Sequence, residues 1–135
     1  MKIKAVTEQL HIAPETLRYW ERVGAIPPVN RDEAGYRDYD QEDIEWIEFA
    51  QCMRDAGVSV EYLIEYIDLF RQGKRTVQAR KDLLNEQLAT IKAKLDDVQA
   101  TYDKIQAKIA NYDTHVEGYH GKLRPLAEAQ QKPNN

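Results

Sequence analysis

A periodic row of apolar residues in the second half of the chain most strongly limits the folds open to it. From Leu84 onward, apolar side chains recur at alternating spacings of four and three residues. The row consists of Leu84, Leu88, Ile91, Leu95, Val98, Tyr102, Ile105, Ile109, Tyr112, Val116 and Tyr119. This heptad spacing predicts one helix of roughly 54 Å. A lone helix cannot bury so narrow a stripe, so we expect a partner helix, most simply from a second copy of the chain. Packing of the stripe on the same chain's first half remains the alternative.

The first quarter of the chain predicts a helix-turn-helix. Residues 3–10 and 14–23 show helical spacing of apolar side chains and are separated by a tight turn. Pro14 suits the first position of the second helix, where a missing N–H costs nothing. Gly24 suits the left-handed position just past the end of that helix.

The next segment predicts a small hairpin followed by two more helices. Residues 27–39 carry turn chemistry at Asp32-Glu33-Ala34-Gly35 between strand-forming residues. Asp40 and Ser59 are suited to cap a third and a fourth helix, and Gly73 closes this half of the chain.

The expected fold is therefore mainly α. It comprises a winged helix-turn-helix DNA-binding domain over residues 1–73 and a dimerising coiled-coil helix over residues 74–121. Residues 122–135 are expected to form a flexible C-terminal tail.

Composition and the first residues predict a cytoplasmic chain without a membrane span. No run approaches the ~18 apolar residues of a membrane span, and Met1-Lys2-Ile3-Lys4 lacks the apolar core of a signal peptide. Cys52 is the single cysteine and cannot form an internal disulfide.

The charge distribution argues both for and against nucleic acid. The net charge is −4, and residues 1–73 hold 8 basic and 15 acidic side chains. The basic side chains nevertheless gather early in the chain, where one face can be positive. They are Lys2, Lys4, Arg18, Arg22, Arg31 and Arg37.

Two short motifs outweigh the acidic balance. Thr16-Leu17-Arg18-Tyr19-Trp20-Glu21-Arg22 lies on the second predicted helix, and Gly35-Tyr36-Arg37-Asp38-Tyr39 lies in the predicted hairpin. Arginine reaches phosphates and guanine edges, while a tyrosine hydroxyl donates to phosphate. A helix and a hairpin that each offer both side chains are suited to binding a duplex. The expected DNA-binding residues are Lys4, Pro14, Thr16, Arg18, Tyr19, Trp20, Arg22, Arg31, Tyr36, Arg37 and Tyr39.

These motifs resemble the MerR family of bacterial transcription regulators. The resemblance is carried by the run from Thr16 to Arg22, then Gly24, Pro28, Gly35-Tyr36-Arg37-x-Tyr39, Asp43-Ile44 and Arg54-x-x-Gly57. It implies an antiparallel homodimer on a pseudo-palindromic operator between widely spaced promoter elements. It also implies that a signal makes the dimer kink and untwist double-stranded DNA so that RNA polymerase can engage. RNA polymerase would thus be an indirect partner of the regulator.

Cys52 is the expected signal-sensing residue. The chain resembles the aldehyde- and nitrosothiol-responsive subgroup, in which a lone cysteine on the third helix takes a small electrophile. The alternative is a core thiol shielded by Phe49, Ala56 and Glu48. A regulator with a different signal, or with none, also remains open.

Other function classes fit less well. No nucleophile with a base, and no Gly-rich phosphate loop, is present, so we expect no enzyme and no cofactor. Paired cysteines are absent, and His115 and His120 do not share a helical face, so no metal site is expected. A coiled-coil adaptor without specific DNA binding is the remaining alternative.

Overall fold

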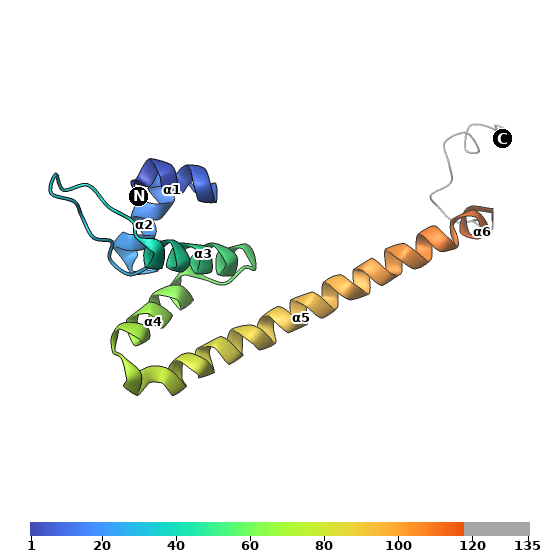
Figure 1. Cartoon of the computed structure of the whole chain (residues 1–135). Coiled ribbons are helices and arrows are strands. Elements are labelled where there is room, and N and C mark those ends of the chain that lie inside the picture. The colour runs from blue at the N-terminus through green and yellow to red at the C-terminus, as the bar shows by residue number, and fades with distance from the viewer. Residues whose placement is uncertain (118–135) are drawn as a thin grey trace, which may run out of the picture. The chain divides into compact units, whose positions relative to one another are not determined.

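The structure is a computed structural model that describes the backbone of residues 1–117 and the side chains of residues 1–114. Its elements, drawn in Figure 1, are α1 (Ile3–Leu10), α2 (Pro14–Val23), α3 (Gln41–Asp55), α4 (Val60–Arg71), the 3-10 turn η1 (Lys74–Thr76), α5 (Val77–Ala110) and α6 (Tyr112–Glu117). The mainly α fold is confirmed. The chain divides into two units, and we call the first, Met1–Ile91, the head.

The helix-turn-helix forms with the bounds that the sequence predicts. His11 joins α1 to α2 in the left-handed conformation, with φ 56° and ψ 46°. A side chain there is uncommon and costs some backbone strain. Gly24 ends α2 at φ 88°, and its N–H donates to the carbonyls of Trp20 and Glu21. Local capping chemistry therefore sets the length of the recognition helix α2.

Residues 27–39, which we call the wing, form a tight turn with one isolated β-bridge. Arg31 and Arg37 make an isolated antiparallel bridge. Asp32 organises the turn, because its N–H donates to the carbonyl of Tyr36 at 2.8 Å and its carboxylate accepts from the N–H of Tyr36 at 2.9 Å. The predicted turn is confirmed.

The predicted strands on either side of that turn are wrong, since the described residues contain no named strand. Pro27 and Pro28 have no N–H to donate to a ladder. The N–H of Tyr39 donates to the carbonyl of Met1 at 2.7 Å instead of pairing within the wing. Pairing is thus confined to the residues next to the turn.

Both predicted caps that begin α3 and α4 are confirmed. Asp40 accepts from the N–H of Asp43 at 2.8 Å, and the Asp43 carboxylate accepts from the N–H of Asp40 at 2.9 Å. This is a capping box with aspartate in the place of the usual glutamate. Ser59 Oγ accepts from the N–H of Tyr62 at 3.1 Å.

The core of the head joins all four short helices. Its most deeply buried side chains are Val6, Leu17, Ile26, Ile47 and Leu63. They come from α1, α2, the segment after α2, α3 and α4. Val29 and Tyr39 of the wing belong to the same cluster, so the recognition helix and the wing are anchored to one apolar core.

Aromatic rings pack α3 on α4. The rings of Trp46 and Phe70 meet edge to face with centroids 4.8 Å apart, and Phe49 lies 5.5 Å from Tyr66. Burial raises the pKa of Tyr62 to about 12, because the phenolate would be poorly solvated there.

The first turns of α5 belong to the head. Leu83 and Ile91 pack against the head core, and the guanidinium of Arg80 lies 5.2 Å from the Phe70 ring centroid. Leu88 between them is 66% exposed. Among the members of the predicted row from Leu84 to Tyr112, Ile91 is thus the one that packs against the core of its own chain, and the others are exposed.

The predicted single helix through Tyr119 is interrupted at Asn111. The Asn111 side-chain amide donates to the carbonyl of Ala107 at 2.9 Å, and α6 begins at the next residue. Such a side-chain bond to backbone competes with helix continuation. Tyr119 and the predicted tail, 122–135, lie outside the described residues. Among the helices that are described, none has the length and apolarity needed to span a bilayer.

Candidate nucleic-acid interface

One side of α2 carries exposed cations and an aromatic ring. Arg18, Tyr19 and Arg22 are exposed, while Leu17 and Trp20 on the other side of the helix are buried. The guanidinium of Arg22 lies 5.4 Å from the centroid of the Tyr19 ring. This cation–π contact keeps the two side chains together on the outer face.

The wing presents a second set of polar side chains. Tyr36 is 70% exposed, and Arg31 Nη1 donates to the carbonyl of Gly35 at 2.8 Å. Lys2 Nζ donates to Asp32 Oδ2 at 2.6 Å and connects the turn to the residue before α1. This hydrogen bond lowers the pKa of Asp32 and raises the pKa of Lys2, because it favours the ionised form of each.

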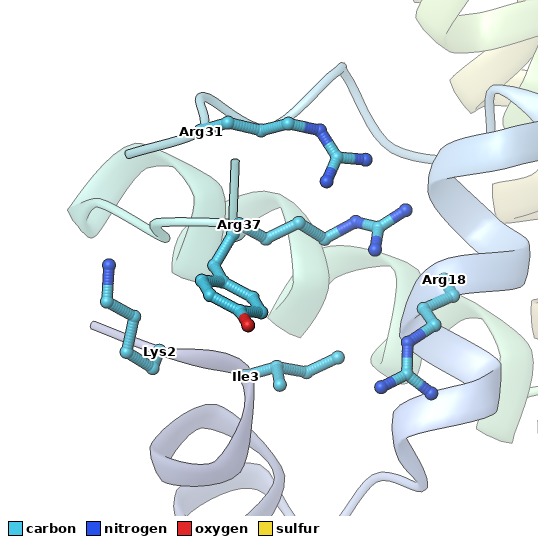
Figure 2. Close-up of a pocket in the computed structure, with 6 residues that line it drawn as sticks. Lys2, Ile3, Arg18, Arg31 and Arg37 are labelled. Carbon is cyan, nitrogen blue, oxygen red and sulfur yellow. The ribbon is translucent and has the colours of Figure 1, made fainter. Parts of the chain in front are cut away.

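The helix and the wing meet at a pocket of about 310 Å³. Its lining residues are Lys2, Ile3, Arg18, Arg31, Tyr36 and Arg37. Figure 2 shows Arg31 and Arg37 extending from the wing and Arg18 from α2. Segments far apart in the chain therefore converge on one cationic surface.

The chemistry of this pocket suits a phosphate-bearing partner. Arginine stays charged at every accessible pH and offers a planar set of N–H donors that matches phosphate oxygens. Three guanidinium groups and one ammonium line a space into which Tyr36 adds a phenol. Four cationic side chains thus line one pocket on a head whose overall charge is negative, and two of them, Lys2 and Arg37, are also bonded to carboxylates.

A carboxylate that sequence reasoning did not single out lies behind this pocket. Glu21 accepts a hydrogen bond from Arg37 Nε and another from the N–H of Val29, the latter at 3.0 Å. It falls within the first motif, but its partners are 16 and 8 residues away. No local pattern pairs a helix glutamate with a particular arginine in a loop, so the sequence held no signal for this contact.

Two of the expected DNA-binding residues lie in the core. Trp20 is 6% exposed and Tyr39 is 2% exposed. Burial raises the pKa of Tyr39, and its hydroxyl has no hydrogen-bond partner among the described residues. The expectation that these two side chains contact DNA is therefore corrected: both stabilise the head by packing.

The remaining expected residues do not line the pocket. Lys4 is exposed on α1, and Pro14 and Thr16 are half-buried in the first turn of α2. Helix N-termini commonly approach phosphates.

Cys52 is exposed on α3, so the alternative of a core thiol shielded by Phe49, Ala56 and Glu48 is wrong. The buried residues of α3 include Ile47 and Ala50. Cys52 follows Ile47 by five residues, roughly 140° around the helix, which turns it away from the core. The core-thiol alternative does not hold for this chain.

Within the described part of the chain, no group of three or more histidine, cysteine, aspartate or glutamate side chains is placed to hold a metal ion. The side chains of His115 and His120 lie outside that part.

The family follows from comparison with known proteins. The profile described as "MerR HTH family regulatory protein" matches residues 1–69, and the profile described as "MerR, DNA binding" matches residues 44–108. The chain belongs to the MerR family. It is a MerR-family DNA-binding transcriptional regulator rather than an enzyme, in agreement with the sequence prediction.

Relatives of this MerR-family chain are regulators too. It is 58% identical over 87 residues to the HTH-type transcriptional regulator AdhR of Bacillus subtilis (strain 168), a match that covers 64% of this chain and 62% of AdhR. It is 29% identical over 126 residues to heavy metal-dependent transcription regulator 2 of Rhizobium meliloti (strain 1021), covering 93% of this chain and 80% of that relative.

Solved structures share the fold. A MerR family transcriptional regulator from Listeria monocytogenes superposes with a TM-score of 0.81 at 41% identity, covering 97% of this chain and 92% of that one. HiNmlR, a MerR family regulator lacking the sensor domain and bound to promoter DNA, gives a TM-score of 0.75 at 25% identity, covering 84% and 90%.

Proposed function

We propose that this MerR-family chain acts as a homodimer on a pseudo-palindromic operator, and that it activates transcription by distorting the promoter in response to a small electrophile. The observation that carries the DNA-binding part is the pocket where Arg18, Arg31 and Arg37 converge. A fixed pair of such surfaces, one on each protomer, would contact two half-sites at a set separation. Promoter DNA lies in the cytoplasm of a bacterium, which remains the expected compartment.

The apolar row supports the dimer. On α5, Leu95, Val98, Tyr102, Ile105 and Ile109 are each at least 55% exposed. A row of large apolar side chains at heptad spacing is stabilised when a second helix covers it. The proposed division is a DNA-binding part, residues 1–73, a dimerising part, residues 74–121, and a tail beyond them.

Distortion of DNA is the proposed route to activation. Bending and untwisting a site costs on the order of several kcal/mol, which wing and helix contacts can offset. A signal changes the outcome only if it binds one dimer arrangement better than the other. RNA polymerase would respond to the altered DNA rather than to a contact with the regulator.

DNA binding is tested with Arg18. A duplex selected from a random pool by the wild-type chain serves as the probe in a fluorescence anisotropy titration. Arg18→Ala is expected to weaken binding by about 10- to 100-fold, as loss of a bidentate arginine contact does. If Arg18 contacts phosphate, the slope of log affinity against log salt also falls by about one.

Arg71→Ala provides the matched control. Arg71 is exposed in the last turn of α4 and does not line the pocket, so its removal makes the same change in net charge. It is expected to leave the selected-duplex affinity nearly unchanged. Equal losses for both variants, or no preference of the wild type for the selected duplex over a scrambled one, contradict the proposal.

The electrophile response is assigned to Cys52 because its thiol is exposed and the chain resembles the aldehyde-responsive subgroup. On the same helix, Gln51 Nε2 donates to the carbonyl of Leu10 at 2.8 Å, the last residue of α1. A change at Cys52 would thus occur next to a direct contact between α3 and the helix-turn-helix. The alternative of a coiled-coil adaptor without specific DNA binding is not supported, since the family is one of DNA-binding regulators.

Cys52→Ser is expected to abolish induction of a promoter reporter by formaldehyde or methylglyoxal while leaving operator affinity unchanged. Intact-mass spectrometry of the wild type and of Cys52→Ser after the same aldehyde treatment checks the chemistry, because an adduct on the single cysteine is the one that the variant must lack. Full induction in the Cys52→Ser strain would show that the signal, if any, is received elsewhere.

A further inference from the structure

The carboxylate of Glu21 connects the recognition helix to both arms of the wing. Glu21 Oε2 accepts from the N–H of Val29, which precedes the turn, and Oε1 accepts from Arg37 Nε, which follows it. The Glu21 and Arg37 side chains are 14% and 22% exposed, respectively. A charged pair this sheltered is screened less than one on the open surface.

This arrangement determines which part of Arg37 reaches the pocket. The bond to Glu21 occupies Nε, and an arginine carries four further N–H groups on its two terminal nitrogens. Arg37 lines the pocket with Arg18 and Arg31 (Figure 2). Glu21 thus fixes the Nε edge of an arginine that lines the pocket.

A carboxylate in this position would weaken DNA binding if it acted only through its charge. A carboxylate next to a phosphate-binding surface repels the phosphate and weakens association. Three guanidinium groups around one pocket also repel each other, and a carboxylate bonded to one of them reduces that cost. The geometry favours this second role because both carboxylate oxygens accept hydrogen bonds from the wing.

We propose that Glu21 is a positioning residue for DNA binding: it fixes the wing on α2 so that Arg37 meets the same stretch of backbone as Arg18. This inference rests on the proposed function of the pocket. It adds a residue that stabilises the complex without contacting DNA.

A positioning role of Glu21 and simple charge repulsion by Glu21 predict opposite changes in DNA affinity for Glu21→Gln. An amide can accept from only one of the two donors, because its other end is itself a donor. The positioning role therefore predicts binding to the selected duplex that is about tenfold weaker, the size of one lost charge-assisted contact. The salt slope should also fall by about one as Arg37 loses its phosphate. Repulsion alone predicts tighter binding and a steeper slope.

Glu33→Gln is the matched control, since Glu33 is exposed in the wing turn and its neutralisation makes the same charge change. It is expected to leave binding unchanged or slightly tighter. If Glu21→Gln behaves like Glu33→Gln, the positioning role is overturned.

Thermal unfolding of each variant establishes that the head is folded at the assay temperature. Should Glu21→Gln be unfolded there, Glu21→Asp replaces it, because a shorter carboxylate keeps the charge but cannot reach both donors. Weaker binding by Glu21→Asp supports positioning, and wild-type binding overturns it.

A double-mutant cycle separates action through Arg37 from a general loss of structure. Arg37→Gln alone should weaken binding, and adding Glu21→Gln should weaken it no further. Full additivity of the two losses would overturn the proposal. Failure of the proposed function gives a different result, because the wild type itself would then bind selected and scrambled duplexes equally.

Discussion

Lysine at two positions of the apolar row, Leu95→Lys with Ile105→Lys, is expected to convert the dimer to a monomer and to weaken operator binding by about 10²- to 10⁴-fold. The wild-type side chains are 58% and 55% exposed on α5. Covering each with a partner helix stabilises the dimer by roughly 1.5–3 kcal/mol, and a lysine ammonium placed there must instead be desolvated. A monomer retains one half-site contact, and so loses the gain from linked binding.

Two lysines on the opposite face of the same helix provide the control. Ala93→Lys with Ala100→Lys adds the same charge at exposed positions outside the heptad row. Alanine and lysine are both good helix formers, so α5 itself should be little affected. Sedimentation velocity gives the mass of each species, and anisotropy gives its affinity for the selected duplex. A double-lysine variant of the row that remains dimeric, or a monomeric wild type, would refute the proposed assembly.

Features governed by neighbouring residues could be predicted from the sequence. The bounds of α1 and α2, the left-handed Gly24 and the capping box of Asp40 and Asp43 all depend on side chains within a few positions of one another. Capping and turn preferences act over that range, so the pattern and the structure agree.

Features governed by distant partners could not be predicted in the same way. Tyr39 looked like a wing contact, but its ring is buried in the core of the head. Trp20 lies within the first motif, directly after the exposed Arg18 and Tyr19, and it also packs inward. Both residues suit either a DNA face or a core, and only the packing of other helices decides between them. The contact of Glu21 with Arg37 has the same origin.

The exposure of Cys52 was within reach of sequence reasoning. Ile44, Ile47 and Ala50 mark the buried side of α3, and a residue two positions after Ala50 falls well away from it. The alternative of a shielded thiol depended on the neighbours of Cys52 along its own helix rather than on the direction of the core. A helical projection centred on the buried residues corrects that error.

Leu17→Ala is expected to destabilise the head by about 2–5 kcal/mol, through lost apolar burial and the cavity left behind. Leu17 has 0% exposure and lies at the centre of the cluster that supports α2. A domain of this kind is stable by only about 5–15 kcal/mol, so the variant would retain a small margin. Each kcal/mol corresponds to about 4–8 °C in a domain of this size, which predicts a fall in melting temperature of about 8–40 °C.

Arg18 is the next residue along α2, and its substitution should affect DNA affinity rather than stability, in contrast to Leu17→Ala. Its side chain is exposed and lines the pocket, so Arg18→Ala should change stability by no more than about 0.5 kcal/mol while it strongly reduces DNA affinity. Leu17→Ala, measured well below its melting temperature, should bind DNA with nearly wild-type salt dependence, because its phosphate contacts are intact in the folded fraction. Circular dichroism melts and anisotropy titrations of the two variants separate these effects. Wild-type stability of Leu17→Ala would mean that α2 is not held by the apolar cluster, and the alignment of Arg18 with the wing would then need another cause.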